Sequence, residues 1–183
     1  MRCVSAIVLT AVLANPLITQ AVESHSEVSG ESYDVYSAVF RERYSMWFRS
    51  DAVLRISSYT KLSLPREGRV AGSCRRRTKD KPSDLELLNK LISINSTRKS
   101  IKPRLSLPAR YALFTKDIKI KAGEEPGAIW LSVVAFSDDR QHAMVWVSNY
   151  CGNLCGSGLL WKLEKNRSVW RVTSKQPVCG FIS

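Results

Sequence analysis

Apolar residues recur through the first part of the chain at spacings that predict two kinds of element. Tyr36, Phe40 and Tyr44 stand four residues apart, which places an apolar stripe along one side of a helix. We therefore predict a helix over residues 32–44. Residues 53–60 are instead rich in branched and aromatic side chains, and this composition favours a strand.

A second helical pattern begins at Ser83. Ser83 and Glu86 have the spacing of a capping box, and leucine and isoleucine then recur on one broad face. This pattern predicts a helix over residues 84–94. Two prolines end any continuation, and the aromatic-rich residues 110–115 are typical of a short strand.

The C-terminal part of the chain carries a more regular pattern. Four apolar segments of strand length follow one another, at residues 129–136, 143–147, 159–163 and 169–172. The links between them are short and polar, so neighbouring strands are expected to run antiparallel, because a parallel pair needs a crossover of about a dozen residues. The pattern predicts a C-terminal four-stranded meander.

These elements together predict an α+β fold in which two N-terminal helices pack on an antiparallel sheet that ends in the meander. Within residues 159–163, Lys162 alternates with large apolar side chains. Such alternation is typical of a strand with one face against helices and the other face in water. We therefore expect both helices to cover the same face of the sheet.

The first residues have the pattern of a secretory leader. A basic start at Arg2 precedes an apolar run over residues 3–14, and a small-residue site follows. This run is shorter than the roughly 18 residues that span a bilayer, so a signal peptide over residues 1–21 is favoured over an uncleaved anchor. A disordered tail over residues 22–31 and a single domain over residues 32–183 follow. The mature protein is expected to be secreted or periplasmic.

The cysteines add covalent links to this picture. Without the leader the chain keeps an even number of cysteines, which favours two disulfides in an exported protein. Three pairings of Cys74, Cys151, Cys155 and Cys179 are possible. We favour Cys151 with Cys155, because glycines permit a tight loop there, together with Cys74 and Cys179.

Basic residues concentrate in the middle of the chain. The formal net charge is +12, and residues 61–121 hold seventeen basic and five acidic side chains. Within the segment 66–81, whose order the pattern leaves open, the candidate anion-binding residues are Arg75, Arg76, Arg77, Lys79 and Lys81.

Such a run attracts an anionic partner, for example a membrane surface, a cell-wall polymer or an acidic polysaccharide. The alternative is a solvated loop that only keeps the protein in solution. Nucleic acid is disfavoured as a partner, because no aromatic side chains for base stacking interrupt the run.

The cysteine loop itself has a recognisable motif. Residues 151–158 are Cys-Gly-Asn-Leu-Cys-Gly-Ser-Gly, followed by a leucine–lysine strand and then a tryptophan–valine strand. Over roughly its last 55 residues the chain resembles a family of uncharacterised exported bacterial proteins with a CGxLCGxG loop between antiparallel strands. That family has no known activity, so the resemblance implies only that the loop is a defined structural unit.

A thiol enzyme is the sharpest catalytic hypothesis for this loop. Cys151 or Cys155 would be the nucleophile, and His142 would act as its base, oriented by Asp138 or Asp139. However, an extended strand places His142 about 25 to 30 Å from the cysteines, and nearby cysteines in an exported protein favour a disulfide. No catalytic residue is therefore assigned.

Other kinds of site have little support. The histidines His25 and His142 lie far apart in the sequence and the cysteines do not form two close pairs, so neither a metal nor a cofactor is expected. The glycine loop lacks the lysine and the following helix of a phosphate-binding loop. Four tryptophans either fill the core, which we favour, or line a ligand groove: Trp130, Trp146, Trp161 and Trp170.

The sequence therefore predicts an exported, non-enzymatic binding or interaction protein of the cell envelope. Its partner would be an anionic polymer, a membrane surface or a protein, bound by the basic segment or by the sheet face. The alternative is an enzyme, thiol-based or otherwise, whose site lies hidden between the sheet and the helices.

Overall fold

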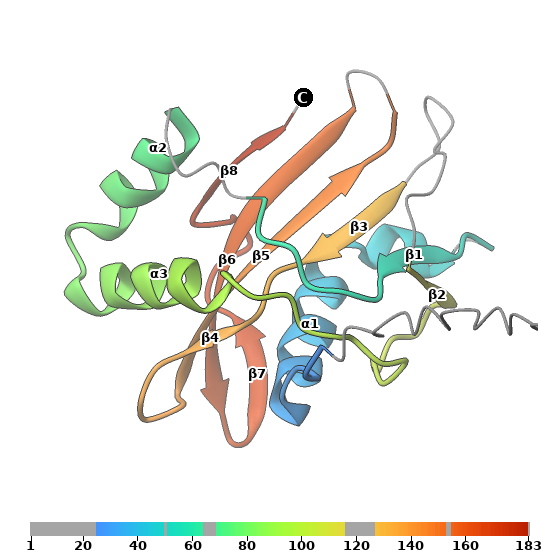
Figure 1. Cartoon of the computed structure of the whole chain (residues 1–183), viewed down its shortest axis with the longest axis horizontal. Coiled ribbons are helices and arrows are strands. Elements are labelled where there is room, and N and C mark those ends of the chain that lie inside the picture. The colour runs from blue at the N-terminus through green and yellow to red at the C-terminus, as the bar shows by residue number, and fades with distance from the viewer. Residues whose placement is uncertain (1–24, 50, 64–68, 116–126, 153–154, 183) are drawn as a thin grey trace, which may run out of the picture.

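The protein combines helices with one mixed sheet in a computed structural model that describes residues 25–49, 51–63, 69–115, 127–152 and 155–182 (Figure 1). The helices are α1 (Gly30–Arg43), the 3-10 helix η1 (Ser45–Arg49), α2 (Arg69–Thr78) and α3 (Pro82–Ile94). The strands are β1 (Leu54–Ser57), β2 (Tyr111–Phe114), β3 (Ala128–Leu131), β4 (Ala135–Phe136), β5 (His142–Tyr150), β6 (Gly156–Asn166), β7 (Val169–Val172) and β8 (Cys179–Ile182). The predicted α+β class is confirmed.

The predicted signal peptide, residues 1–21, lies outside the described residues. Among the residues that are described, no helix has the length and apolar composition needed to cross a membrane.

The sheet is built around the long β5–β6 hairpin. These two strands pair antiparallel from His142 opposite Glu164 to Tyr150 opposite Gly156. Each has two short neighbours on its outer edge: β3 and β4 pair with different parts of β5, and β7 and β8 pair with different parts of β6. Figure 1 shows β8 beside the upper part of β6 and β7 beside its lower part.

The far side of the sheet is parallel, which corrects the prediction of an antiparallel sheet. β1 lies between β2 and β3 and runs parallel to both. Since α2 and α3 lie between β1 and β2 in the chain, this connection is long enough for the crossover that parallel pairing requires. The strands predicted over residues 53–60 and 110–115 are confirmed as β1 and β2, but local patterns do not specify their partners.

The four-stranded meander does not describe this sheet, because residues 129–136 are divided between β3 and β4 and because β8 adds a strand that is not predicted. Ser132 occupies the break between β3 and β4. Its backbone N–H donates to the carbonyl of Trp146, and its Oγ accepts the backbone N–H of Trp146. Tyr36 of α1 donates its hydroxyl proton to the carbonyl of Ser132 at 2.8 Å. The chain thus leaves the regular strand while its polar groups stay bonded.

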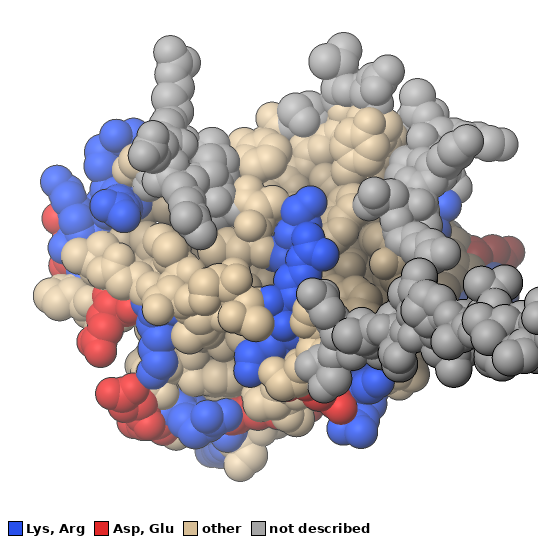
Figure 2. All heavy atoms as spheres, viewed as in Figure 1, with Lys and Arg blue, Asp and Glu red and all other residues tan. Residues whose placement is uncertain are grey.

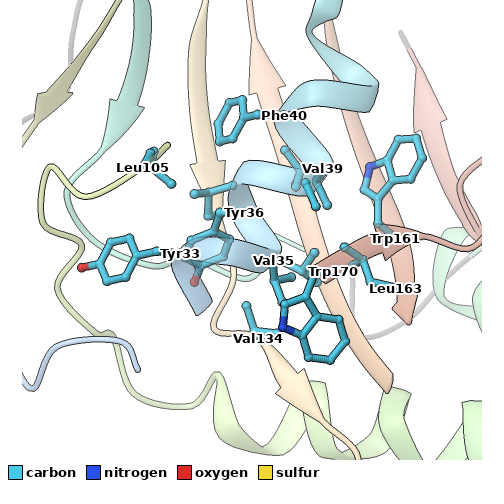
Figure 3. Packing of buried hydrophobic residues seen from close by; sticks show 14 of the residues in the cluster. Tyr33, Val35, Tyr36, Val39, Phe40, Leu105, Val134, Trp161, Leu163 and Trp170 are labelled. Carbon is cyan, nitrogen blue, oxygen red and sulfur yellow. The ribbon is translucent and has the colours of Figure 1, made fainter. Parts of the chain in front are cut away.

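One face of the sheet packs against α1, which confirms the helix predicted over residues 32–44. Tyr36 and Phe40 point from α1 toward the sheet, where Trp161 of β6 and Trp170 of β7 are buried (Figure 3). Alternate residues of β5 belong to the same cluster: Ala143, Val145 and Val147. We call this surface the α1 face.

The opposite face packs against α2 and α3, which corrects the prediction that the helices share one face. Met144 and Trp146 of β5, which alternate with the residues on the α1 face, form a second buried cluster with Leu88 and Leu91 of α3. In Figure 1, α1 (blue) is correspondingly separate from α2 and α3 (green). Helices therefore cover both faces, and the helix predicted over residues 84–94 is confirmed as α3 on what we call the α2/α3 face.

The segment that forms α2 has no predicted element, because few apolar residues mark it. Cys74 anchors this helix to Cys179 of β8 through a disulfide, with the Cα atoms 5.2 Å apart. A second disulfide joins Cys151 to Cys155, whose Cα atoms are 5.1 Å apart. Both bridges are the pairs favoured from the sequence.

The chain before α1 is held in place over residues 25–29, which form part of the tail predicted to be disordered over residues 22–31; residues 22–24 of that tail lie outside the described residues. Glu27 forms a β-bridge with Ser100, and the backbone N–H of Val28 donates to the carbonyl of Ser100 at 3.1 Å. Val28 is also buried in the cluster on the α1 face. The sequence does not reveal this contact, because the partner of the segment lies beyond α3 in the chain.

Candidate anion-binding site

The five predicted anion-binding residues lie at one corner of the molecule, where α2 ends and α3 begins. We call this region the basic corner, and its members are Arg75, Arg76 and Arg77 in the last turn of α2 and Lys79 and Lys81 in the link to α3. All five side chains are exposed. Cys74, one residue earlier, is fully buried and bonded to β8, so the arginines extend from a helix that is tied to the sheet.

The cations of the basic corner have no counter-ions in the part of the chain that the structure describes, where none of the five forms an ion pair or a side-chain hydrogen bond. Elsewhere basic side chains are paired: Arg140 and Lys165 share Glu31, and Arg104 pairs with Glu27 at 3.2 Å. Figure 2 shows lysine and arginine side chains gathered over α2. Three positive charges also suit the C-terminal end of α2, where the helix dipole is negative.

A hollow of about 670 Å³ opens beside this corner, between the α2–α3 link, β6 and the chain that leads into β8. Arg77 and Lys81 line it, whereas the other three members of the basic corner do not. Lys162 of β6 also lines the hollow, but its ammonium is ion-paired with Asp84 in the first turn of α3. Arg77 and Lys81 therefore supply the free positive charge.

A second hollow of about 400 Å³ follows β8. Arg77 lines this hollow as well as the first one, so the two hollows meet at this residue. Phe181 and Ile182 of β8 form part of its wall and are exposed, at 37% and 77% of their surface. The basic corner thus continues into a surface with apolar side chains.

Lys162 and Asp84 are the residues of this region that sequence analysis did not assign to the site. Lys162 was expected in water because it alternates with apolar residues in its strand, yet only 18% of its side chain is exposed. Asp84 is 8% exposed and appears in the sequence as part of a capping pattern. Their approach joins α3 to β6, which are remote in the chain, and no local signal reveals it.

The cysteine loop provides no thiol nucleophile, because Cys151 and Cys155 are bonded to each other. His142 begins β5 and Cys151 follows the end of that strand, so they lie at opposite ends of it. The Asp139 carboxylate accepts hydrogen bonds from Ser137 Oγ at 2.5 Å and from a backbone N–H at 3.0 Å. These bonds, above all the one from Ser137, lower the pKa of Asp139. The structure thus places His142 and the two aspartates at one hollow, but the cysteines lie at the other end of β5.

A separate hollow of about 450 Å³ lies between α3 and the turn from β4 to β5, and His142 lines it. Lys90 and Asp138, which also line it, form an ion pair at 2.8 Å, and Nδ1 of His142 is buried without a hydrogen-bond partner. Among the described residues, no three or more His, Cys, Asp or Glu side chains are grouped so as to hold a metal ion. An enzyme with a site between sheet and helices stays a prediction.

Comparison of the chain with protein-family models, with curated proteins and with solved structures found no match. The assignment of a site therefore depends on the geometry and charge of the chain's own residues, and the basic corner is the strongest candidate.

Proposed function

We propose that this protein is an exported, non-enzymatic binding protein that holds an anionic polymer of the cell envelope at the basic corner. The observation that carries the proposal is the set of exposed cations that have no counter-ion among the described residues, at the end of a helix tied to the sheet. Cations of this kind create a positive potential that attracts and orients an anionic partner. The two disulfides support an oxidising compartment outside the cytoplasm.

The shape of the corner favours a polymer over a membrane surface. Arg77 and Lys81 line a hollow, and Arg77 also lines the adjoining hollow along β8. A chain-like polyanion can enter these concave surfaces, whereas the headgroups of a flat bilayer would contact the outward-facing charges first. A protein with an acidic surface loop is the remaining alternative, and it would use the same cations.

Binding of polyglutamate and of polygalacturonate, measured by titration calorimetry, tests this proposal. The triple variant Arg75→Gln, Arg76→Gln, Arg77→Gln should weaken binding of both polymers about ten-fold or more, because each exposed ion pair contributes roughly 0.5 to 1 kcal/mol. Wild-type binding should also fall steeply as salt rises toward about 0.5 M, where the screening length is about 4 Å.

The matched control removes three positive charges elsewhere. Arg98, Lys102 and Arg167 are exposed and carry no ion pair in the described part of the chain, so their joint replacement by glutamine changes the net charge equally. This control should weaken binding about two-fold at most, through the long-range field alone. Equal losses in both triple variants, or no binding by the wild type at low salt, would overturn the proposal.

A further inference from the structure

A fourth hollow, of about 370 Å³, lies beside the cysteine loop at the end of the β5–β6 hairpin. It is separate from the hollow beside the α2–α3 link, and its size falls within the range of small-molecule pockets. Its lining includes Lys61, Ser63, Trp130, Ser148, Tyr150 and Phe181. We call it the loop pocket. On the α2/α3 face, α3 packs on β4 and β5 and α2 packs on β8, whereas β3 packs mainly on its neighbouring strands.

A chain of hydroxyl groups gives the loop pocket a defined polarity. The indole N–H of Trp146 donates to Ser63 Oγ at 3.1 Å, and Ser63 Oγ in turn donates to Ser148 Oγ at 2.8 Å. An indole nitrogen can only donate, so Ser63 Oγ accepts from Trp146, and the proton of Ser63 then goes to Ser148. The Ser148 hydroxyl keeps its own proton, and within the described chain no side-chain or backbone acceptor takes it.

Charge on the lining points to the same kind of ligand. Lys61 Nζ lies 5.6 Å from the centroid of the Trp130 ring, and this ammonium forms no ion pair in the described part of the chain. No acidic side chain is among the described residues that line the pocket. Ser148 and Lys61 therefore both offer donors, and a ligand with an anionic acceptor such as a carboxylate complements them.

The walls add flat apolar surface. Trp130 is partly exposed, and Tyr150 and Phe181 expose 44% and 37% of their surfaces. The Phe181 ring lies against Gly158, where an added Cβ would collide with Phe181 and with Trp146. Gly158 therefore lets Phe181 lie close to the sheet. Aromatic walls together with hydroxyl groups suit the apolar ring face and polar rim of a sugar better than they suit a purely apolar molecule.

The loop pocket also adjoins the surface that leads to the basic corner. Phe181 lines both the loop pocket and the hollow along β8, and Arg77 lines that hollow and the one beside the α2–α3 link. A polymeric ligand that lies across Phe181 can reach Lys61 on one side and Arg77 on the other. Carboxylates spaced along such a chain would meet both cations.

From these contacts we infer that the loop pocket binds one carboxylated sugar unit, a hexuronic acid, of an acidic polysaccharide. The inference rests on the proposed function, because it names the polymer that the basic corner holds. Lys61 and Ser148 receive the carboxylate, Trp130 and Phe181 contact the sugar ring, and the rest of the chain follows β8 to Arg77.

Two oligomers with six carboxylates each separate ring recognition from charge. Wild-type protein should bind hexagalacturonate about ten-fold more tightly than hexaglutamate, which is the increment expected for an aromatic contact and a hydrogen bond. Phe181→Leu removes only the ring contact, so it should weaken hexagalacturonate binding about five-fold and leave hexaglutamate affinity unchanged. Ser148→Ala removes a donor to the carboxylate and should weaken hexagalacturonate binding about five-fold. The triple arginine variant should weaken both ligands alike.

The monosaccharides give a readout that does not depend on the polymer or on any variant. Free galacturonate should shift the backbone amide resonances of Ser148 and Tyr150 in the wild-type protein, and galactose, which lacks the carboxylate, should not. Equal affinity for the two hexamers without these shifts would overturn the inference and leave the proposed function standing. Shifts without polymer binding would overturn the proposed function and, with it, the polysaccharide assignment.

Discussion

The two faces of the sheet are stabilised in different ways. On the α1 face a large cluster with seven buried aromatic residues, among them Tyr36, Phe40, Trp161 and Trp170, joins α1 to the strands. The cluster on the α2/α3 face is smaller, and a disulfide from Cys74 ties its outer helix to the sheet. Noncovalent packing is thus the main support of one face, while the other depends on a covalent link as well.

Charge differs between the faces in the same way. Glu31 at the start of α1 accepts from Lys165, Arg140 and the Trp170 indole N–H, so the two basic residues near it share a counter-ion. The arginines at the end of α2 have no such partner in the described chain. Packing and pairing on the α1 face therefore support the fold, and the anchored but unpaired cations on the other face remain available to a ligand.

Removing the disulfides should give the largest change in the free energy of unfolding and should test whether the α2/α3 face depends on a covalent link. Replacing Cys74 and Cys179 by alanine should lower the free energy of unfolding by about 5 kcal/mol in the chain-entropy estimate, because the bridge closes a sequence separation of 105 residues. Replacing Cys151 and Cys155, which are separated by 4 positions, should lower it by about 2 kcal/mol. Chemical denaturation of both double variants measures the difference.

Amide hydrogen exchange then shows which elements lose stability when a disulfide is removed. Without the bridge from Cys74, α2 and β8 should lose protection first, while α1 keeps it, because α1 packs independently of that bridge. A uniform loss across the protein, or equal costs for the two bridges, would contradict the division between the faces.

Truncating one buried side chain on each face should give the next largest effects. Phe40→Ala should cost about 4 kcal/mol and Leu88→Ala about 3 kcal/mol, since both side chains are at most 1% exposed and leave cavities. Met46→Ala is the control, because Met46 is 72% exposed and its truncation should change stability by less than about 0.5 kcal/mol. Denaturant titration of the three variants checks this order, and a larger cost at Leu88 would reverse the comparison.

Sequence patterns predict the elements whose signals are local. The stripe through Phe40 identifies α1, the apolar face through Leu88 identifies α3, and glycines beside Cys151 favour its short bridge. The capping box predicted at Ser83 is not formed, because α3 begins at Pro82 and its N-cap is Lys81, with no side-chain cap hydrogen bond. α2 is missed because its support comes from Cys179, far along the chain, and from packing on α3. The parallel pairing of β1 with β3 is missed for the same reason, since alternation within a strand does not identify its neighbour.

The residues of the candidate sites also fall into those that the sequence marks and those that only the fold brings together. Charge density marks Arg77 and Lys81 in the sequence, and the structure places both at one hollow. The loop pocket gains Lys61 and Phe181 from opposite parts of the chain, and only the fold brings these residues together. Neighbours in sequence can thus be assigned from composition, whereas residues joined by tertiary contacts require the structure.

A smaller effect is expected at the ion pair beneath α3. Lys162→Met should cost roughly 2 to 3 kcal/mol, because it leaves the Asp84 carboxylate, whose side chain is 8% exposed, without its cation. The adjoining hollow admits water, so the cost should fall below that of a fully buried pair. Adding Asp84→Asn should restore most of the loss in a double-variant cycle. If the double variant instead costs as much as the two single variants added together, Lys162 and Asp84 are not coupled.

The smallest effect should come from the paired charge on the α1 face. Burial raises the pKa of Glu31, but hydrogen bonds from Lys165 and Arg140 and their positive charges outweigh it, so the folded pKa lies below its ordinary value. The stabilisation is therefore present above the unfolded pKa of about 4.3 and is lost as pH falls through the folded pKa. Glu31→Gln should cost about 1 to 2 kcal/mol at neutral pH. Wild-type stability should approach that of the variant on acidification from about pH 6 to pH 3, as denaturation at each pH measures. A constant difference between them over this range would show that Glu31 contributes through packing and neutral hydrogen bonds, and not through the ion pairs that distinguish the start of α1 from the end of α2.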